Sequence, residues 1–143
     1  MHLLPLYPII PIRKGDTWTG WKELARRIEH ERTEMGEETF VFGHEYKIPS
    51  EITFYTKNHL PTHCGEIIEE KGLQYTFWTN IDELIGKDAI FVTSNAQRYR
   101  AIDRMRKYFE KIEEDEPLVI KHHGKVFREF YIYRCYGYKG VPQ

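Results

Sequence analysis

Ala89-Ile90-Phe91-Val92-Thr93 is the stretch of this sequence that says most about its fold. The apolar residues are consecutive rather than alternating, as in a parallel strand that helices cover on both faces. Helical and extended patterns alternate on either side of this stretch, which indicates an α/β fold. We expect a three-layer α/β/α sandwich with a mostly parallel sheet and an antiparallel hairpin at its C-terminal end.

The helices around this strand are predicted from apolar residues spaced three and four apart. Asp16 or Thr17 can cap a first helix, which Gly36 then ends. A second helix is expected over residues 49–57, where a proline suits the first turn. A third is expected over residues 95–111, with an inner stripe of large apolar side chains.

The remaining extended segments are predicted to join the same sheet. Residues 39–42 read as a short buried strand. Residues 60–64 form a weaker strand near a sheet edge, because their proline has no amide hydrogen to donate. Residues 116–122 and 125–136 form two strands of a hairpin that turns at His123-Gly124.

Length and composition limit the classes of protein that fit. The chain has 143 residues, 41% of them hydrophobic, and it holds eight Phe, ten Tyr and three Trp. One domain with an aromatic-rich core is expected, and disorder as the main state is excluded. The net charge of -1 gives no overall field that would attract nucleic acid, so no nucleic-acid partner is expected. No apolar run approaches the length of a transmembrane helix.

The N-terminal segment, residues 1–15, differs from the rest of the chain. Between Leu3 and Ile12 large apolar residues are punctuated by a proline at every third position, which favours polyproline II and excludes a helix. Such a segment either covers the core of its own domain or contacts a part of the protein that is missing. We therefore divide the chain into this lead-in and a single soluble α/β domain over residues 16–143.

Motifs for several kinds of chemistry are missing. No glycine-rich phosphate loop follows the strand at 39–42, and no serine lies in a G-x-S-x-G turn, so neither a dinucleotide site nor a serine hydrolase is indicated. His59, His63 and Cys64 have a spacing that a proline interrupts, so no metal site is predicted. Cys64 and Cys135 are either buried small apolar residues or a disulfide between neighbouring strands. No catalytic residue and no cofactor are assigned.

Two segments remain as candidates for ligand contact. Arg98, Arg100 and Arg104 belong to a basic stretch that is either a solvated helix face or a contact for an anion such as a phosphorylated lipid or sugar. The segment 74–78 concentrates aromatic residues in a predicted loop. It either folds over the sheet edge as a small satellite core or presents a surface for carbohydrate or lipid.

Four short motifs occur in an order that resembles a known family. The stretches are Thr19-Gly20-Trp21-Lys22-Glu23-Leu24-Ala25, Ile48-Pro49-Ser50-Glu51-Ile52-Thr53-Phe54-Tyr55, Gln74-Tyr75-Thr76-Phe77-Trp78 and Gly86-Lys87-Asp88-Ala89-Ile90-Phe91-Val92. They resemble the extramembrane C-terminal domain of polytopic glycosyltransferases of the dolichyl-phosphate-mannose protein mannosyltransferase type. That type includes the transferases that add aminoarabinose to lipid A. The resemblance covers roughly residues 20–93.

The resemblance implies a function that this chain cannot perform alone. In that family the donor is a polyprenyl-phosphate sugar, and the catalytic acidic residues lie beside membrane helices that precede the soluble domain. The chain would then be a non-catalytic, membrane-attached domain on the extracytoplasmic side, capping the membrane active site and helping acceptor recognition. Its partners would be the transmembrane domain of the full-length protein and the donor or acceptor. Gln74, Tyr75 and Trp78 match the aromatic loop of the family and would face the cavity or support it.

Under this interpretation the lead-in is the exit from the bilayer interface. Two other hypotheses stay open on the residues alone. The chain could be a self-contained α/β module that binds a sugar or a phosphorylated ligand. It could also be a small independent enzyme, although the loop motifs that such an enzyme needs are missing from the sequence.

Overall fold

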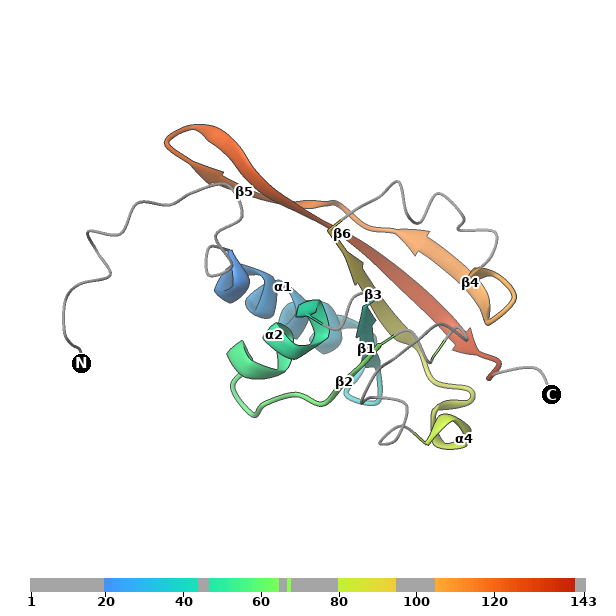
Figure 1. Cartoon of the computed structure of the whole chain (residues 1–143). Helices are drawn as coiled ribbons and strands as arrows, with labels where there is room; N and C mark the ends of the chain where they lie inside the picture. Colours follow the sequence, from blue (N-terminus) through green and yellow to red (C-terminus); the bar gives the residue numbers. More distant parts are fainter. Residues whose placement is uncertain (1–19, 44–46, 65–66, 68–79, 95–104, 141–143) are drawn as a thin grey trace.

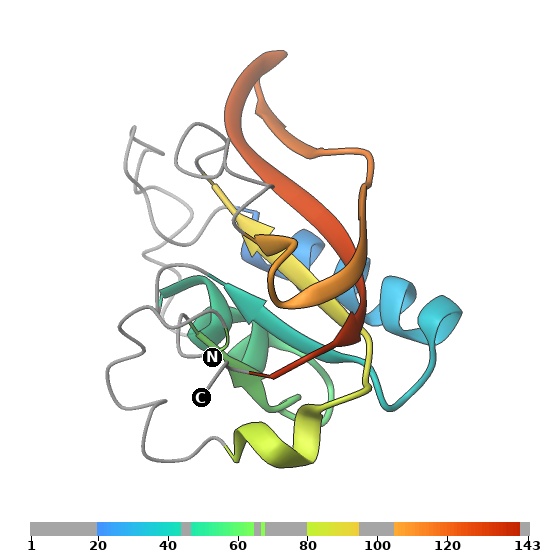
Figure 2. The ribbon, with the colours of Figure 1, turned by 90° about the vertical axis from the view of Figure 1, so that its right-hand side faces the viewer.

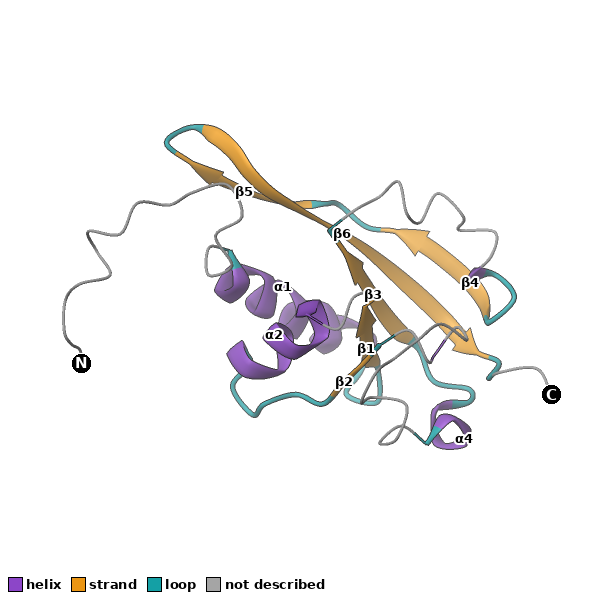
Figure 3. Cartoon of the chain, in the orientation of Figure 1, coloured by secondary structure: helices purple, strands orange, loops and turns teal. Residues whose placement is uncertain are grey.

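A computed structural model describes residues 20–43, 47–64, 67, 80–94 and 105–140 of the chain (Figure 1). In these residues, helices come before and between the first three strands, and the last three strands, which are antiparallel, follow one another (Figure 3). In chain order the elements are α1 (Trp21–Met35), β1 (Phe40–Gly43), α2 (Lys47–Tyr55), β2 (Thr62–His63), α4 (Ile81–Leu84), β3 (Ala89–Thr93), β4 (Phe109–Glu114), β5 (Leu118–His122) and β6 (Lys125–Tyr138).

The described strands form one mixed sheet in the order β2-β1-β3-β6-β4, and β5 pairs with β6 outside this path. β1 runs parallel to both β2 and β3, whereas β6 runs antiparallel to β3, β4 and β5. The protein is therefore of the α/β class. Of the pairings between described strands, two are parallel and three are antiparallel. The parallel part and the antiparallel part meet between β3 and β6.

The stretch 89–93 is confirmed as a central strand. All five residues of β3 are buried, with β1 on one side and β6 on the other. Alternate side chains of β3 point to opposite faces of the sheet. Phe91 therefore faces one core, and Ile90 and Val92 face another.

One core lies between the sheet and the helices α1 and α2, which lie together on one face (Figure 1). The apolar residues of α1 recur at helical spacing, so they form the stripe that packs on the sheet. The buried residues of this helix-side core are Trp21, Leu24, Ile28, Val41, Ile48, Ile52, Ile90, Val92, Ile120, Phe130 and Ile132.

The second core lies on the opposite face and is rich in aromatic rings. The Phe42 ring lies 4.9 Å from that of Phe91 and 5.8 Å from that of Phe109, measured between centroids. The Tyr138 hydroxyl donates a hydrogen bond of 2.6 Å to the carbonyl of Ile67, which satisfies the polar end of a fully buried tyrosine. Leu84 of α4 packs against the same cluster, so α4 belongs to this face.

Several sequence predictions are confirmed locally. Gly36 follows the last residue of α1, and Pro49 lies in the first turn of α2. β2 lies at the edge of the sheet, and β5 and β6 form a hairpin that turns at His123-Gly124. Both turn residues have positive φ, which suits a tight hairpin. The start of α1 was predicted wrongly, because its N-cap is Gly20 and not Asp16 or Thr17.

The predicted helix over 95–111 is wrong at its C-terminal end. Residues 95–104 lie outside the described part, but Phe109 already begins β4 and pairs with Tyr138 of β6. The Phe109 ring lies 5.2 Å from the Tyr138 ring and is 1% exposed, so burial between neighbouring strands outweighs local helix preference. The charged residues that follow Phe109 are mostly exposed.

We expect Phe91→Ala to lower the free energy of unfolding by about 3–5 kcal/mol, because it removes a fully buried ring between two packed neighbours. The matched control is Phe54→Ala, since Phe54 is 64% exposed on α2 and should cost less than about 1 kcal/mol. Urea unfolding followed by tryptophan fluorescence measures both. Equal losses in the two variants would contradict the central position of β3.

Candidate functional site

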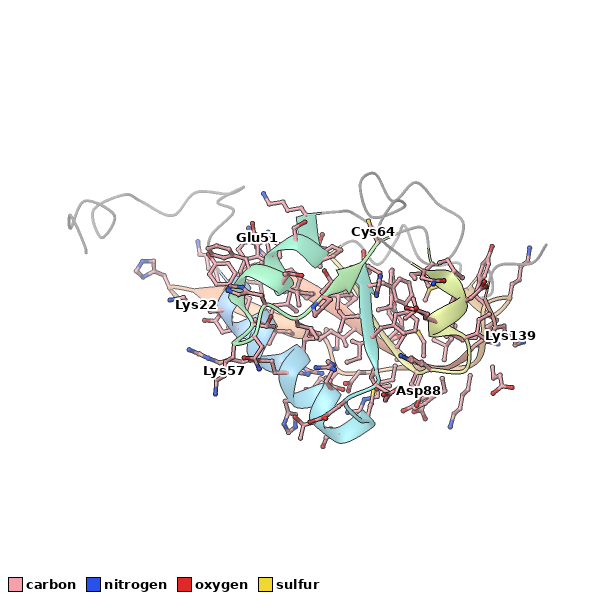
Figure 4. All side chains as sticks on the ribbon, turned by 90° about the horizontal axis from the view of Figure 1, so that it is seen from below. Lys22, Glu51, Lys57, Cys64, Asp88 and Lys139 are labelled. Carbon is pink, nitrogen blue, oxygen red and sulfur yellow. The ribbon has the colours of Figure 1, made fainter. Side chains whose placement is uncertain are left out.

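The carboxyl ends of the three parallel strands form the first candidate site. β1 ends at Gly43, β2 at His63 and β3 at Thr93, and their parallel register brings these ends to one edge of the sheet. Figure 4 shows Cys64 beyond this edge and Asp88 at the opposite end of the strands. In open α/β sheets, ligands bind in the crevice outside the carboxyl ends of the strands. We call this region the carboxyl edge.

The first turn of α2 packs closely on the carboxyl edge. A β-carbon on Gly43 would lie 3.0 Å from Cδ of Pro49 and 3.2 Å from the carbonyl oxygen of Val92. Only a glycine lets β1 and the helix approach this closely without a shift of their neighbours. The sequence therefore fixes the N-terminal end of α2 directly above the last residues of β1 and β3.

Threonine hydroxyls hold α2 against β2. The Thr62 hydroxyl donates to the carbonyl of Pro49 at 2.8 Å and lies 2.8 Å from the Thr53 hydroxyl. The Thr53 hydroxyl is also 2.7 Å from the carbonyl oxygen of Leu60. The Leu60 amide in turn donates to the Thr56 hydroxyl at 2.8 Å. These bonds position the carboxyl edge from the side of β2, where the strand itself is only two residues long.

The described groups at the carboxyl edge suit binding better than catalysis. Thr93 is buried and Ser94 is exposed at the end of β3, and Ser50 lies in the first turn of α2. Hydroxyls of this kind can bind the oxygens of a sugar or a phosphate. A binding role uses such hydroxyls directly, whereas acid-base or covalent catalysis would need a pair of carboxylates or a nucleophile with an adjacent base.

Both cysteines are buried, and neither is in a disulfide bond. Of the two readings of the sequence, the buried small apolar residue is confirmed and the disulfide is wrong. Cys135 belongs to the aromatic core, and its burial raises the pKa of its thiol far above the ordinary value. A thiol that stays protonated is a poor nucleophile, so Cys135 has a packing role.

A second polar cluster lies between α1 and the sheet. Glu31, at an inner position of α1, is 3% exposed and accepts hydrogen bonds from Arg27 at 2.9 Å and from Arg134 at 2.6 Å. Arg134 also reaches Glu34 at 2.7 Å, and Arg27 lies 3.2 Å from Asp115. We call these five residues the charge cluster. They join α1, β6 and the turn between β4 and β5.

The surroundings of Asp115 and of Arg134 favour the ionised form of each side chain. Burial alone would raise the pKa of Asp115, but its hydrogen bonds with Glu31, the Glu116 amide and Arg27 lower that pKa below the ordinary value. Burial works against the charge of Arg134 too, yet the hydrogen bonds to Glu34 and Glu31 raise the pKa of its guanidinium. Each charge faces an opposite one, so the cluster serves to attach the helix to the sheet.

The residues selected from the sequence as ligand contacts are not placed by this structure. Gln74, Tyr75 and Trp78 lie outside the described residues, and so do Arg98, Arg100 and Arg104. The segment with the arginines follows Ser94 in the sequence. Sequence reasoning missed the charge cluster. Its one local signal was a glutamate three residues after Ile28 on the apolar stripe of α1.

General searches add three findings. In the ranges that the structure describes, no helix combines the length and the apolar character that crossing a membrane requires. Within the same ranges no three His, Cys, Asp or Glu side chains are grouped so that they could hold a metal ion. Comparison of the chain with protein-family models, with curated proteins and with solved structures finds no match.

Arg134→Met should lower the free energy of unfolding by about 2 kcal/mol, because it leaves the Glu31 carboxylate buried with one partner fewer. The double variant Glu31→Leu/Arg134→Met should lose clearly less, about 1 kcal/mol, since no uncompensated buried charge remains. Lys57→Met, at an exposed lysine, is the matched control. Urea unfolding measures all three, and equal losses in the single and double variants would show that the pairing has no energetic role.

The charge cluster should also make stability depend on acid pH. Because the pKa of Asp115 is lower in the folded chain, its contribution is complete above about pH 4 and is lost as the pH falls through the folded pKa. We expect Asp115→Asn to be less stable than the parent at pH 7 but to lose less stability between pH 7 and pH 3. Urea midpoints at several pH values test this, and parallel pH profiles would refute it.

Proposed function

We propose that this chain is the extramembrane C-terminal domain of a polyprenyl-phosphate-sugar-dependent glycosyltransferase of the mannosyltransferase-like type. In this role it is not catalytic by itself. It caps the membrane active site and helps to recognise the acceptor. It is attached to the extracytoplasmic side of a membrane by preceding transmembrane helices, which are its main partner.

The observation that carries the proposal is how the family-like motifs pack. Trp21 and Leu24 come from the first motif, Ile48 and Ile52 from the second, and Ile90 from the last. All five are buried in the helix-side core, although the motifs are separated by more than twenty residues along the chain. The first, second and last motifs, which were selected only for their order in the sequence, therefore contribute to the same core. This is expected if they belong to one domain.

The proposal gives roles to three segments that lie outside the described residues. Gln74, Tyr75 and Trp78 would line or support the cavity, and Arg98, Arg100 and Arg104 would contact the phosphate of a donor or an anionic acceptor. The helical segments there would complete a three-layer sandwich. The lead-in, residues 1–15, would be the exit from the bilayer. The acid-base groups for sugar transfer would come from the membrane part, because the carboxyl edge offers hydroxyls in its described residues.

The carboxyl edge favours a second candidate function, a self-contained module that binds a sugar or a phosphorylated ligand. Its hydroxyl groups and the nearby start of α2 have the chemistry for such a ligand. This candidate needs no membrane part. It predicts that the isolated chain is stabilised in thermal unfolding by one member of a panel of sugars and nucleotides.

We expect the genomic reading frame upstream of Leu3 to encode many hydrophobic spans. Membranes that contain the complete protein should transfer sugar from a polyprenyl-phosphate donor. The 143-residue chain alone should not transfer sugar, because in the family that it resembles the catalytic carboxylates lie in the membrane part. In the complete protein, removal of residues 16–143 should abolish or strongly reduce transfer, as measured with radiolabelled donor.

Two results would contradict the proposal. A natural start codon at Met1 would remove the membrane part on which it depends. Sugar transfer by the isolated chain would show that the chain is itself an enzyme. A thermal shift with a sugar or a phosphorylated ligand, together with a natural start at Met1, would favour the binding module.

A further inference from the structure

The hairpin of β5 with the first half of β6 projects from the rest of the molecule. β6 pairs with β3 and β4 through residues 131–138, but its residues 125–130 pair with β5. Figures 1 and 2 show this hairpin extending beyond the sheet in two perpendicular views. We call residues 118–130 the arm.

One face of the arm is anchored to α1. The Phe130 ring lies 5.2 Å from the Trp21 ring, and the Arg128 guanidinium lies 5.0 Å above the same indole. Ile120, opposite Arg128 in the hairpin, is 6% exposed. The base of the arm is thus held in one orientation by packing with the start of α1.

The other face of the arm is open to solvent. Val126 is 55% exposed and pairs with the exposed Lys121, and Val119 is 40% exposed on the same face. Glu129, opposite Val119, accepts a hydrogen bond of 2.5 Å from the Tyr131 hydroxyl. The two exposed valines share this face with Lys121 and Glu129, so the face combines apolar and charged side chains.

The charge of the arm is opposite to that of the chain. The arm contains Lys121, Lys125, Arg128 and two histidines against one acidic residue, Glu129, so its net charge is +2, whereas the whole chain has a net charge of -1. A local positive field on a weakly acidic protein selects an anionic partner. Combined with the exposed valines, it suits a surface that is negatively charged outside and apolar just beneath, as an anionic bilayer is.

The start of the described chain lies at the arm. A β-carbon on Gly20 would be 2.7 Å from Cγ1 of Ile120, so the chain enters the domain in direct contact with the arm. The apolar stretch that ends at Ile12 precedes Gly20 by eight residues, a span of at most about 28 Å. If that stretch leaves a bilayer, the arm is the part of the described domain that is tied to the same region.

From these observations we infer that the arm docks on the surface of an anionic lipid bilayer. Lys121, on the face of the valines, and Lys125, at the start of β6 beside the turn, bind lipid phosphates, and Val119 and Val126 enter the headgroup region. This inference rests on the proposed function for the position of the lead-in, but its charge and apolar arguments concern the arm alone. Docking would fix the orientation of the domain over the membrane active site.

The first experiment is co-sedimentation of the 143-residue chain with vesicles of phosphatidylcholine, with and without about one third phosphatidylglycerol. Lys121→Glu/Lys125→Glu should weaken binding to the anionic vesicles by about 25-fold or more, since each lysine near such a surface contributes about fivefold. The control Lys57→Glu/Lys139→Glu changes the net charge equally at exposed sites distant from the arm and should bind within about twofold of the parent (Figure 4).

The second experiment tests entry into the headgroup region. Val126→Cys labelled with an environment-sensitive dye should shift its emission to the blue on anionic vesicles, whereas Lys57→Cys should not. Selective labelling is feasible because Cys64 and Cys135 are buried. Circular dichroism and thermal unfolding check that each variant is folded. Val119→Ser/Val126→Ser should weaken binding by about tenfold, because it removes the apolar contribution.

The outcomes separate this inference from the proposed function. Unchanged binding of the Lys121→Glu/Lys125→Glu variant, or no preference of the parent for anionic vesicles, overturns the docking role. Either result leaves the upstream reading frame as an independent test of the glycosyltransferase. A natural start at Met1 with arm-dependent binding intact would refute the proposed function and retain an arm that binds membranes.

Discussion

The antiparallel ladder between β3 and β6 is the connection on which the described structure depends. It pairs residues 89–93 with residues 131–135, and it joins the parallel unit β2-β1-β3 to the antiparallel unit β6-β4-β5. Its register decides which side chains of both strands face each core. A shift of β6 by one residue relative to β3 would turn Tyr133 and Cys135 from the aromatic core to the helix side and bring their neighbours on β6 into that core. The anchored base of the arm and the position of Arg134 beside α1 both follow from the same register.

Sequence reasoning was accurate where a local pattern decides the structure. The uninterrupted apolar run at 89–93 correctly predicted the central strand, and His123-Gly124 correctly predicted the turn of the hairpin. It was wrong at 109–111, where Phe109 is followed by Glu, Lys and Ile in a sequence of high helix propensity. β4 forms there because β6, more than twenty residues later in the chain, offers a ladder and a buried ring. Such nonlocal pairing leaves little trace in a single sequence.

The candidate sites were harder to predict than the fold, for the same reason. The charge cluster joins Glu31 to Arg134 across 103 residues, and no spacing rule connects positions so far apart. The position of the carboxyl edge depends on the strand order, and the strand order depends on pairings between strands that are distant in the sequence. By contrast, the motifs that suggested a glycosyltransferase domain were local. Residues of three of these motifs, among them Trp21 and Ile52, lie in the helix-side core.

The two strands at the ends of the described sheet path, β4 and β2, have features that hinder pairing with a further strand. β4, at one end, has Glu110, Lys111, Glu113 and Glu114 among its six residues, and most of them are exposed. β2, at the other end, has only two residues and follows Pro61. A dense row of charges and a short strand beside a proline both prevent one molecule from adding its edge to the edge of another. At these two described edges, pairing between copies is therefore disfavoured, which lowers the tendency of a domain so rich in aromatic rings to form fibrils.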